Sequence, residues 1–328
     1  MKVLITDHPW PDLVLERTIC EQAGHELIAG PIDVLPREAI DDLVAEHQPH
    51  AIMCCWAPVS ERAINAPRDL RIVARLGVGL DNIAIAAATA RGAWVTNVPD
   101  YCVEEVSDHV IAMLLARWRG IVDFDRRTKQ GEWNPASARL VRTRNMTVGL
   151  IGYGRIGRMT ARKLSQGFGA RVLATSPTLL EEHVIGTEIA PGVLAATVEL
   201  IQHEADAIVL HLPLTATNHH MIDGAFLAAC RRKPMLINVS RGGLVDNDAL
   251  VSALDAGLLS GAALDVVEGE PSPPASLVGR PDVIVTPHIA FTSDASLAEV
   301  RTRCTEDVVR VLRGDKPLHP CNAPALRR

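Results

Sequence analysis

TVGLIGYGRIGR is the sequence of residues Thr147–Arg158, and it predicts a strand, a tight turn and the start of a helix. An apolar run suited to a buried parallel strand leads into a G-x-G-x-x-G pattern made by Gly152, Gly154 and Gly157. In this pattern the first glycine permits the turn, the second lets the backbone approach phosphates, and the third lets helix and strand pack closely. The stretch therefore predicts a site for the pyrophosphate of a dinucleotide at a helix N-terminus.

The neighbouring sequence supports this interpretation. A helical pattern continues to Leu164, and an apolar run at Arg171–Thr175 completes a strand, helix and strand unit. Glycine-rich turns are common by themselves, so the alternative is an ordinary structural turn, which this context disfavours.

Composition restricts the class of protein. A chain of 328 residues is long enough for about two domains. A net charge of -6 without a block of like charges gives no indication of a basic surface that would bind nucleic acid or an anionic membrane. No apolar run reaches the ~18 residues needed to span a bilayer. We therefore expect a globular protein whose partner is a small molecule.

The seven cysteines are scattered and lack the C-x-x-C or Cys/His spacing of metal sites. They are expected to be reduced, mostly buried thiols of a cytoplasmic protein, and no metal ligands are predicted. The apolar run within Lys2–Asp7 is too short for a signal peptide.

The first part of the chain, residues 1–98, alternates short apolar runs with amphipathic helical segments. This alternation predicts a parallel sheet covered by helices, including Arg37–His47 and Ile83–Ala90. Strands are expected at Val3–Thr6, His25–Ala29, Ala51–Cys55, Ile72–Leu76 and Trp94–Val98. After the fourth strand, the loop Arg75–Asn82 is either an anion-binding nest or an ordinary turn capped by Asp81 or Asn82.

Two segments then interrupt the alternation. The helical run Val103–Arg119 follows Pro99 and suits a crossover between domains. The charged, irregular stretch Asp123–Arg144 is expected to be an arm or loop that serves packing or subunit contact.

The second part of the chain predicts another doubly wound sheet, with a helix at Asp246–Leu258. The last helical pattern, Ser293–Arg313, either stays with this sheet or returns to the first domain. Strands are expected at Ala207–Leu212, Met235–Val239, Ala262–Val267 and Val283–Thr286.

Polar residues directly follow the last three of these strands. They include Arg241, the acids Glu268 and Glu270, and His288. Because the carboxyl ends of parallel strands converge on the ligand crevice, we expect these side chains to meet there. These residue types are typical of hydride transfer to a carbonyl group. An arginine can bind a substrate carboxylate through two hydrogen bonds, and a histidine beside a glutamate can exchange a proton.

At this point several motifs, in order and spacing, resemble the signatures of the D-isomer-specific 2-hydroxyacid dehydrogenases. They are Arg75–Asn82, Gly152–Gly157, Asn238–Asp246, Ala263–Pro271 and Thr286–Ala290. The resemblance implies an α/β fold of two doubly wound parallel-sheet domains, a Rossmann cofactor domain and a smaller flavodoxin-like substrate domain. The substrate domain would comprise residues 1–98 plus 294–328, and the cofactor domain, with crossover helix and dimerisation arm, residues 99–293 of a homodimer.

The same resemblance implies roles for individual residues. Arg241 would bind the substrate carboxylate and carbonyl, His288 would be the acid/base, and Glu270 its partner. The cofactor, NAD or NADP, would be contacted by Val106, Gly152, Gly154, Arg155, Ile156, Gly157, Thr175, Ser176, His211, Pro213, Thr217, Val239, Ser240 and Asp265. The 2-keto or 2-hydroxy acid would be contacted by Cys55, Trp56, Val78, Gly79, Arg241 and Phe291.

The chain departs from the family pattern in places. Ser176 stands where NAD-specific members carry an acid, yet no basic residue follows and Glu181 and Glu182 do, so the choice between NAD and NADP stays open. Trp56 and Phe291 either form a pocket wall for a bulky or aromatic acid or serve packing.

Two alternatives keep the same fold. The segments Val103–Glu105 and Asn218–His220 also resemble C-terminal-binding-protein corepressors, which implies a cofactor-sensing interaction protein. The second alternative is a phosphite or phosphonate dehydrogenase. An arginine and an anion-binding backbone nest would hold a phosphorus acid as well as a carboxylate.

Overall fold

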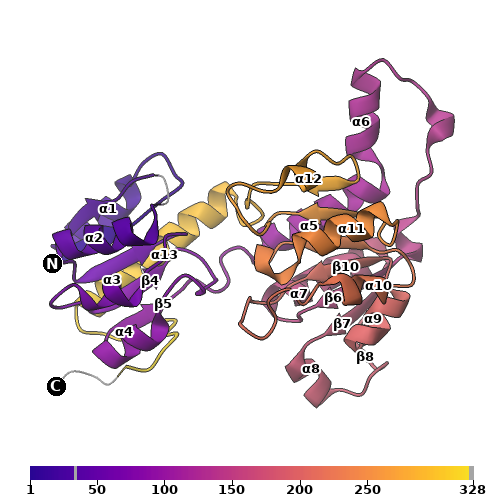
Figure 1. Cartoon of the computed structure of the whole chain (residues 1–328). Helices are drawn as coiled ribbons and strands as arrows, with labels where there is room; N and C mark the ends of the chain where they lie inside the picture. Colours follow the sequence, from indigo (N-terminus) through magenta and orange to yellow (C-terminus); the bar gives the residue numbers. More distant parts are fainter. Residues whose placement is uncertain (33–34, 325–328) are drawn as a thin grey trace. The chain divides into compact units, whose positions relative to one another are not determined.

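The computed structural model describes residues 1–32 and 35–324 and divides the chain into two compact units (Figure 1). The first unit comprises Met1–Tyr101 and Ser293–Arg328, and the second comprises Cys102–Thr292. The predicted substrate domain ends at residue 328, so its last residues, 325–328, lie outside the described part of the chain.

The first unit is a parallel five-stranded sheet in the order β2-β1-β3-β4-β5, which is the flavodoxin-like order. Its strands are β1 (Lys2–Ile5), β2 (Glu26–Ala29), β3 (Ala51–Cys54), β4 (Ile72–Arg75) and β5 (Trp94–Thr96). Its helices are α1 (Val14–Gln22), α2 (Arg37–His47), α3 (Glu61–Asn65), α4 (Ile85–Arg91) and α13 (Asp294–Leu312).

The second unit contains an eight-stranded sheet in the order β13-β12-β11-β10-β6-β7-β9-β8. Six central strands, β9-β7-β6-β10-β11-β12, follow the Rossmann order 3-2-1-4-5-6. The strands are β6 (Thr147–Ile151), β7 (Arg171–Thr175), β8 (Glu188–Ala190), β9 (Val193–Ala195), β10 (Ala207–Leu210), β11 (Met235–Asn238), β12 (Gly261–Leu264) and β13 (Val283–Val285).

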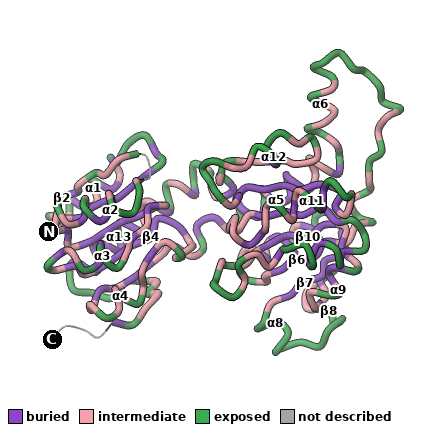
Figure 2. The backbone as a smooth tube through the Cα atoms, viewed as in Figure 1, coloured by how far each residue is buried: buried purple, intermediate pink, exposed green. Residues whose placement is uncertain are grey.

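Helices cover both faces of this sheet, so its central strands are buried (Figure 2). One apolar core lies under α5 and α7 and the other under α9, α10 and α11. The helices are α5 (Val103–Trp118), α6 (Ile121–Lys129), α7 (Arg155–Arg162), α8 (Pro177–Glu182), α9 (Val198–Glu204), α10 (Gly224–Ala228), α11 (Asn247–Asp255) and α12 (Ala275–Val278). The predicted fold class, with two doubly wound sheets, is confirmed.

Three local predictions were wrong. The stretch expected to be irregular begins inside helix α6, where Asp123 pairs with Arg126 one turn later and Asp125 pairs with Lys129. The sheet is not wholly parallel, because β8 pairs antiparallel with β9. The helix expected from Ile83 begins two residues later, at Ile85.

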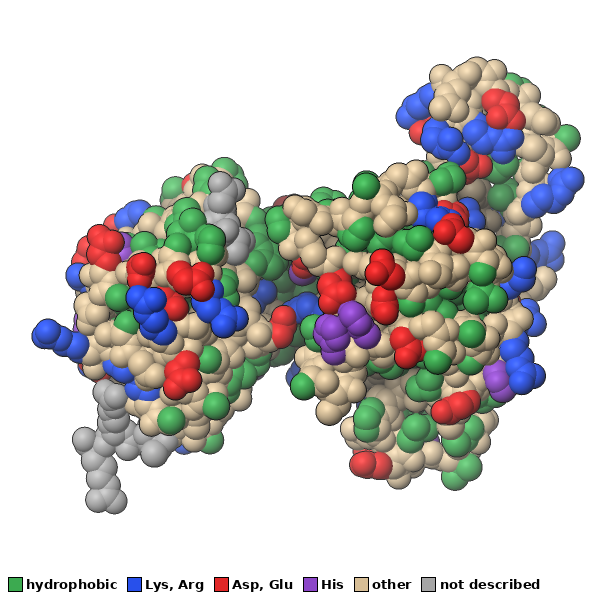
Figure 3. Space-filling view, viewed as in Figure 1, with side chains coloured by type: hydrophobic (Ala, Val, Ile, Leu, Met, Phe, Trp, Pro, Cys, Tyr) green, Lys and Arg blue, Asp and Glu red, His purple; other side chains and the backbone are tan. Residues whose placement is uncertain are grey.

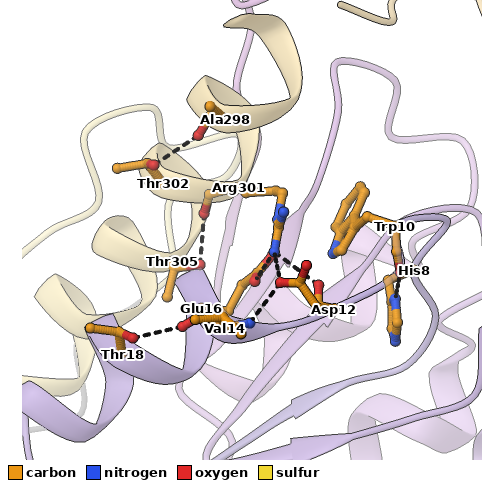
Figure 4. Close-up of polar contacts among 10 residues, drawn as sticks. All are labelled: His8, Trp10, Asp12, Val14, Glu16, Thr18, Ala298, Arg301, Thr302 and Thr305. Carbon is orange, nitrogen blue, oxygen red and sulfur yellow. Dashed lines mark hydrogen bonds and ion pairs between the residues drawn. The ribbon is translucent and has the colours of Figure 1, made fainter. Parts of the chain in front are cut away.

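Helix α13 packs against α1 in the first unit, and Arg301 joins the two helices (Figure 4). Its Nε lies 2.6 Å from Glu16 Oε1 and its Nη2 lies 2.7 Å from Glu16 Oε2, which makes a bidentate pair. The Glu16 side chain is 0% exposed. The guanidinium also lies 5.2 Å from the ring centre of Trp10. A buried carboxylate without its partner would destabilise the fold. The Arg301–Glu16 pair therefore stabilises the packing of α13 against α1.

Candidate functional site

The glycine turn between β6 and α7 is shaped for close approach of an anion. Gly152 has φ +105°, and an added Cβ would lie 2.0 Å from the carbonyl oxygen of His211. At Gly157 an added Cβ would lie 2.3 Å from the carbonyl oxygen of Gly152. At Gly154 it would meet no atom of the described residues within 4 Å. Tight contacts at the outer glycines and open space at the middle one fit the diphosphate of NAD or NADP.

Valine at position 154 and alanine at position 152 should have different effects. Gly154→Val is expected to weaken NAD(P)H binding at least about tenfold, ~1.4 kcal/mol, because the side chain enters the open space. Gly152→Ala is expected to lower stability, because of the positive φ and the contact with His211. Fluorescence titration and urea unfolding measure the two effects. Unchanged NAD(P)H affinity in Gly154→Val would contradict the diphosphate site.

The loop after β11 holds Arg241 through its own polar groups. The Asn238 side chain is buried, and its Nδ2 donates to the carbonyl oxygen of Arg241 over 2.8 Å. Its Oδ1 accepts from Ser240 N over 3.0 Å. Arg241 Nη1 donates to the carbonyl oxygen of Ser240 over 2.7 Å. The backbone that carries Arg241 is therefore fixed from the strand below it.

This loop also packs against the segment after β12. An added Cβ at Gly242 would lie 2.2 Å from the carbonyl carbon of Val267, so only glycine permits the approach. Asn247 Nδ2 donates to the carbonyl oxygen of Glu268 over 3.0 Å. The loop of Arg241 and the segment that leads to Glu270 are thus held together.

His288 and Glu270 form a hydrogen-bonded pair. His288 Nδ1 lies 2.9 Å from Glu270 Oε1. The backbone of His288 has φ +53°, an uncommon conformation for a residue with a side chain. Phe291 meets the imidazole edge to face, with ring centres 6.2 Å apart. Because the carboxylate contacts Nδ1, a proton exchanged with a substrate would pass through Nε2.

Asp265 anchors the loop that carries this histidine. Its buried carboxylate accepts from the Thr286 hydroxyl over 2.6 Å. It also accepts from the backbone N–H groups of Ile289 and Ala290, each over 2.9 Å. Its carbonyl oxygen accepts from His288 N over 2.8 Å. Asp265, predicted as a cofactor contact, is therefore in this structure a support for the His288 loop.

Most of the other predicted cofactor residues lie at or after the carboxyl ends of strands in the second unit. Ser176 caps helix α8, because its Oγ accepts from Leu179 N over 3.2 Å. Ser240 joins the ends of two strands, with its Oγ 2.7 Å from the carbonyl oxygen of Leu210. Arg155 and Ile156 begin α7, Thr175 ends β7, Val239 follows β11, Pro213 and Thr217 lie in the loop after β10, and Val106 is buried on α5.

His211, also predicted to bind cofactor, supports the glycine turn. Its Nε2 lies 3.0 Å from the hydroxyl of Thr160 on α7. The residue as a whole is only partly exposed, and desolvation lowers the pKa of His211 from 6.5 to about 3. The imidazole is therefore neutral in the folded protein at any moderate pH.

This pKa shift predicts a loss of stability in acid. The unfolded state binds a proton at His211 below pH 6.5 and the folded state does so only near pH 3. The contribution of His211 to the free energy of unfolding is thus fully present above pH 6.5, and it falls by about 1.4 kcal/mol per pH unit below that pH. Between pH 6.5 and 5 the wild type should lose ~2 kcal/mol more than His211→Gln in urea unfolding. Identical losses in both proteins would refute a buried neutral imidazole.

In the first unit, Asp7 organises the loop that was predicted to contact substrate. Its carboxylate accepts hydrogen bonds from the backbone N–H groups of Cys55, Trp56 and Ala57 over 2.9, 2.6 and 3.1 Å. The Cys55 side chain is buried, and desolvation raises the pKa of its thiol to about 12. At this position the thiol is therefore neutral and faces the interior.

The loop Arg75–Asn82 is held from two sides. Asn97 Nδ2 donates to the carbonyl oxygen of Val78 over 2.6 Å. Asn82 was considered as a helix cap, which was wrong, since Ala84 precedes α4 and its side chain makes no cap. Asn82 Nδ2 instead donates to the carbonyl oxygen of Ala57 over 2.9 Å. These contacts fix the backbone around Val78 and Gly79.

Sequence reasoning missed Asp7, Asn97 and Asn238, which position these loops. Asp7 follows the first apolar run, so the strand-end argument applied to the second half of the chain would also have indicated it. Asn97 and Asn238 show their importance only through the carbonyl groups they reach in the fold.

The chain is similar to several known proteins. Residues 111–290 match the family model described as D-isomer specific 2-hydroxyacid dehydrogenase, NAD binding domain. A glyoxylate reductase of Korarchaeum cryptofilum is 35% identical over 277 residues, covering 82% of this chain and 81% of that protein. A glyoxylate reductase of Pyrococcus horikoshii is 36% identical over 292 residues, covering 86% and 85%.

A solved structure extends the likeness to the whole chain. The NADPH-dependent glyoxylate/hydroxypyruvate reductase of Sinorhizobium meliloti, in complex with NADP and malonate, is 30% identical with a TM-score of 0.82. The match covers 100% of this chain and 98% of that one. With a family model that matches more than half of its residues and relatives above 30% identity along most of its length, the chain belongs to the D-isomer-specific 2-hydroxyacid dehydrogenase family of NAD(P)-dependent enzymes.

Proposed function

We propose that this enzyme reduces small 2-keto acids to D-2-hydroxy acids with NADH or NADPH. Glyoxylate and hydroxypyruvate are the first candidate substrates, because the relatives described above are named for their reduction. The reaction consumes the keto acid, one hydride and one proton, and yields the hydroxy acid and oxidised cofactor.

When bound, the nicotinamide cofactor would supply a hydride for the carbonyl carbon. His288 donates a proton from Nε2 to the carbonyl oxygen, and Glu270 orients the ring through Nδ1. Arg241 binds the substrate carboxylate and polarises the carbonyl group. The hydrogen bond of 2.9 Å between His288 and Glu270 is the observation that carries the proposal.

Backbone groups of the first unit are also assigned to substrate binding in this proposal. The N–H groups of Val78 and Gly79 would donate to the substrate carboxylate, and Trp56 would line the pocket. The rigid loops fixed by Asp7 and Asn97 support this role, because a pre-ordered donor costs little entropy on binding.

A substrate panel tests the proposal. NADH and NADPH oxidation is followed with glyoxylate, hydroxypyruvate, pyruvate, phenylpyruvate and phosphonopyruvate. Turnover of a small keto acid is expected. Turnover of phenylpyruvate alone would favour the bulky pocket. NADH binding without turnover of any compound would favour the cofactor-sensing alternative. In a separate assay with NAD⁺ and phosphite, NADH formation would favour the phosphite dehydrogenase.

We also propose a cytoplasmic homodimer. Helix α6 and the segment after it expose large apolar side chains that a second subunit would cover, namely Ile121 (57%), Val122 (52%), Trp133 (86%) and Leu140 (39%). Six of the seven cysteines are buried free thiols, which suits a reducing compartment. Sedimentation equilibrium should give twice the chain mass, and a monomer would contradict the dimer.

A further inference from the structure

His219, His220 and Glu268 form a cluster of possible metal ligands on the second unit. His219 Nε2 lies 3.2 Å from Glu268 Oε1, and His220 Nε2 lies 2.8 Å from Glu268 Oε2. One ligand atom from each residue lies within 4.8 Å of the others. Figure 3 shows histidine side chains gathered at the surface of this unit with carboxylates beside them. The sequence predicted no metal site, since Glu268 stands 48 residues after His220.

The backbone brings the two imidazoles to the same side. Successive side chains of an extended chain point apart, but His220 has φ +54° and its ring stacks on that of His219 with centres 3.9 Å apart. The N–H of His220 donates to the carbonyl oxygen of Gly243 over 2.8 Å, which holds this conformation. A left-handed conformation at a non-glycine residue costs of order 1–3 kcal/mol.

The backbone of Glu268 is also held in place. Asn247 Nδ2 donates to the carbonyl oxygen of Glu268, and an added Cβ at Gly242 would lie 2.3 Å from Glu268 N. All three side chains nevertheless reach solvent, with exposed fractions of 50% for His219, 35% for His220 and 38% for Glu268. The ligand set is therefore ordered by its backbone and open to an ion from solution.

We propose that these three side chains bind a zinc-type divalent cation. Zinc prefers imidazole and carboxylate ligands at about 2.0–2.2 Å in tetrahedral geometry, which places neighbouring ligand atoms roughly 3.4 Å apart. The contacts of 3.2 and 2.8 Å to Glu268 would lengthen by about 0.2 and 0.6 Å to reach this spacing. Two neutral imidazoles and one carboxylate give the site a single negative charge, and water would take the fourth position.

The site is separate from the residues assigned to hydride transfer. The catalytic proposal uses Glu270 and Nδ1 of His288, whereas the cation would use Glu268 and the two Nε2 atoms. Binding of the cation therefore does not depend on the catalytic proposal.

Calorimetric titration of the EDTA-treated, full-length protein with zinc chloride tests the site. We expect one zinc ion per chain, with affinity lowered roughly 10–100-fold in His220→Gln and in Glu268→Gln. His183→Gln and His203→Gln, which change exposed histidines elsewhere on this unit, are the matched controls and should bind zinc like the wild type.

Thermal unfolding gives a second readout. Zinc should raise the Tm of the wild type and of both controls in a concentration-dependent way, and raise it less in the two ligand variants. Because all the substituted side chains reach solvent, the Tm values without zinc should stay close to that of the wild type. Absence of zinc binding to the wild type, or equal binding by all five proteins, would overturn the proposal.

Discussion

Replacing His288 with glutamine is expected to lower kcat by about 10²–10⁴-fold, while NAD(P)H binds with nearly unchanged affinity. Glutamine keeps much of the size and polarity of histidine but cannot donate a proton at neutral pH. The diphosphate site proposed at Gly152–Gly157 does not include this side chain, so the cofactor should still bind. Steady-state kinetics and fluorescence titration measure the two quantities.

His183→Gln is the control for this experiment, because His183 is an exposed histidine of the same unit. It should keep the kcat of the wild type. If His288→Gln retained full activity, another group would have to supply the proton, and the role assigned to the pair with Glu270 would be wrong.

Replacing Arg301 with methionine is expected to destabilise the first unit by about 3–5 kcal/mol. The substitution leaves the Glu16 carboxylate, which is 0% exposed, without its bidentate partner. It also removes the contact with Trp10. The urea midpoint of the transition that unfolds the first unit measures the loss.

The double variant Glu16→Leu/Arg301→Met separates charge burial from lost packing. Because it removes both charges, it should recover much of the stability lost in Arg301→Met. Equal destabilisation of the single and double variants would indicate that packing of the arginine stem, and not an unpaired carboxylate, accounts for the loss.

Local pattern was sufficient to predict the sheets and the glycine turn. The spacing of Gly152, Gly154 and Gly157 between an apolar run and a helical pattern specifies strand, turn and helix within a few residues. Short apolar runs separated by amphipathic segments likewise predicted two parallel sheets, and the structure contains both, except that β8 joins the second sheet antiparallel to β9.

Contacts between distant residues account for what the sequence did not predict. Arg301 and Glu16 are 285 residues apart, and nothing near either residue indicates the other. Asp7 reaches backbone groups 48 to 50 residues away, and Asn97 reaches one 19 residues away. Helix α6 was missed because its charged composition is typical of a loop, and its ion pairs Asp123–Arg126 and Asp125–Lys129 become visible only in the helix.

Reduction of hydroxypyruvate with NADPH or NADH carrying two deuterium atoms at C4 of the nicotinamide tests hydride transfer by this enzyme most directly. Mass spectrometry of the product measures deuterium at C2, and chiral chromatography measures its configuration. Direct transfer predicts glycerate with one deuterium at C2 and the D configuration. Unlabelled glycerate, L-glycerate, or no reduction of any 2-keto acid would contradict the assignment of Arg241, Glu270 and His288 to this reaction.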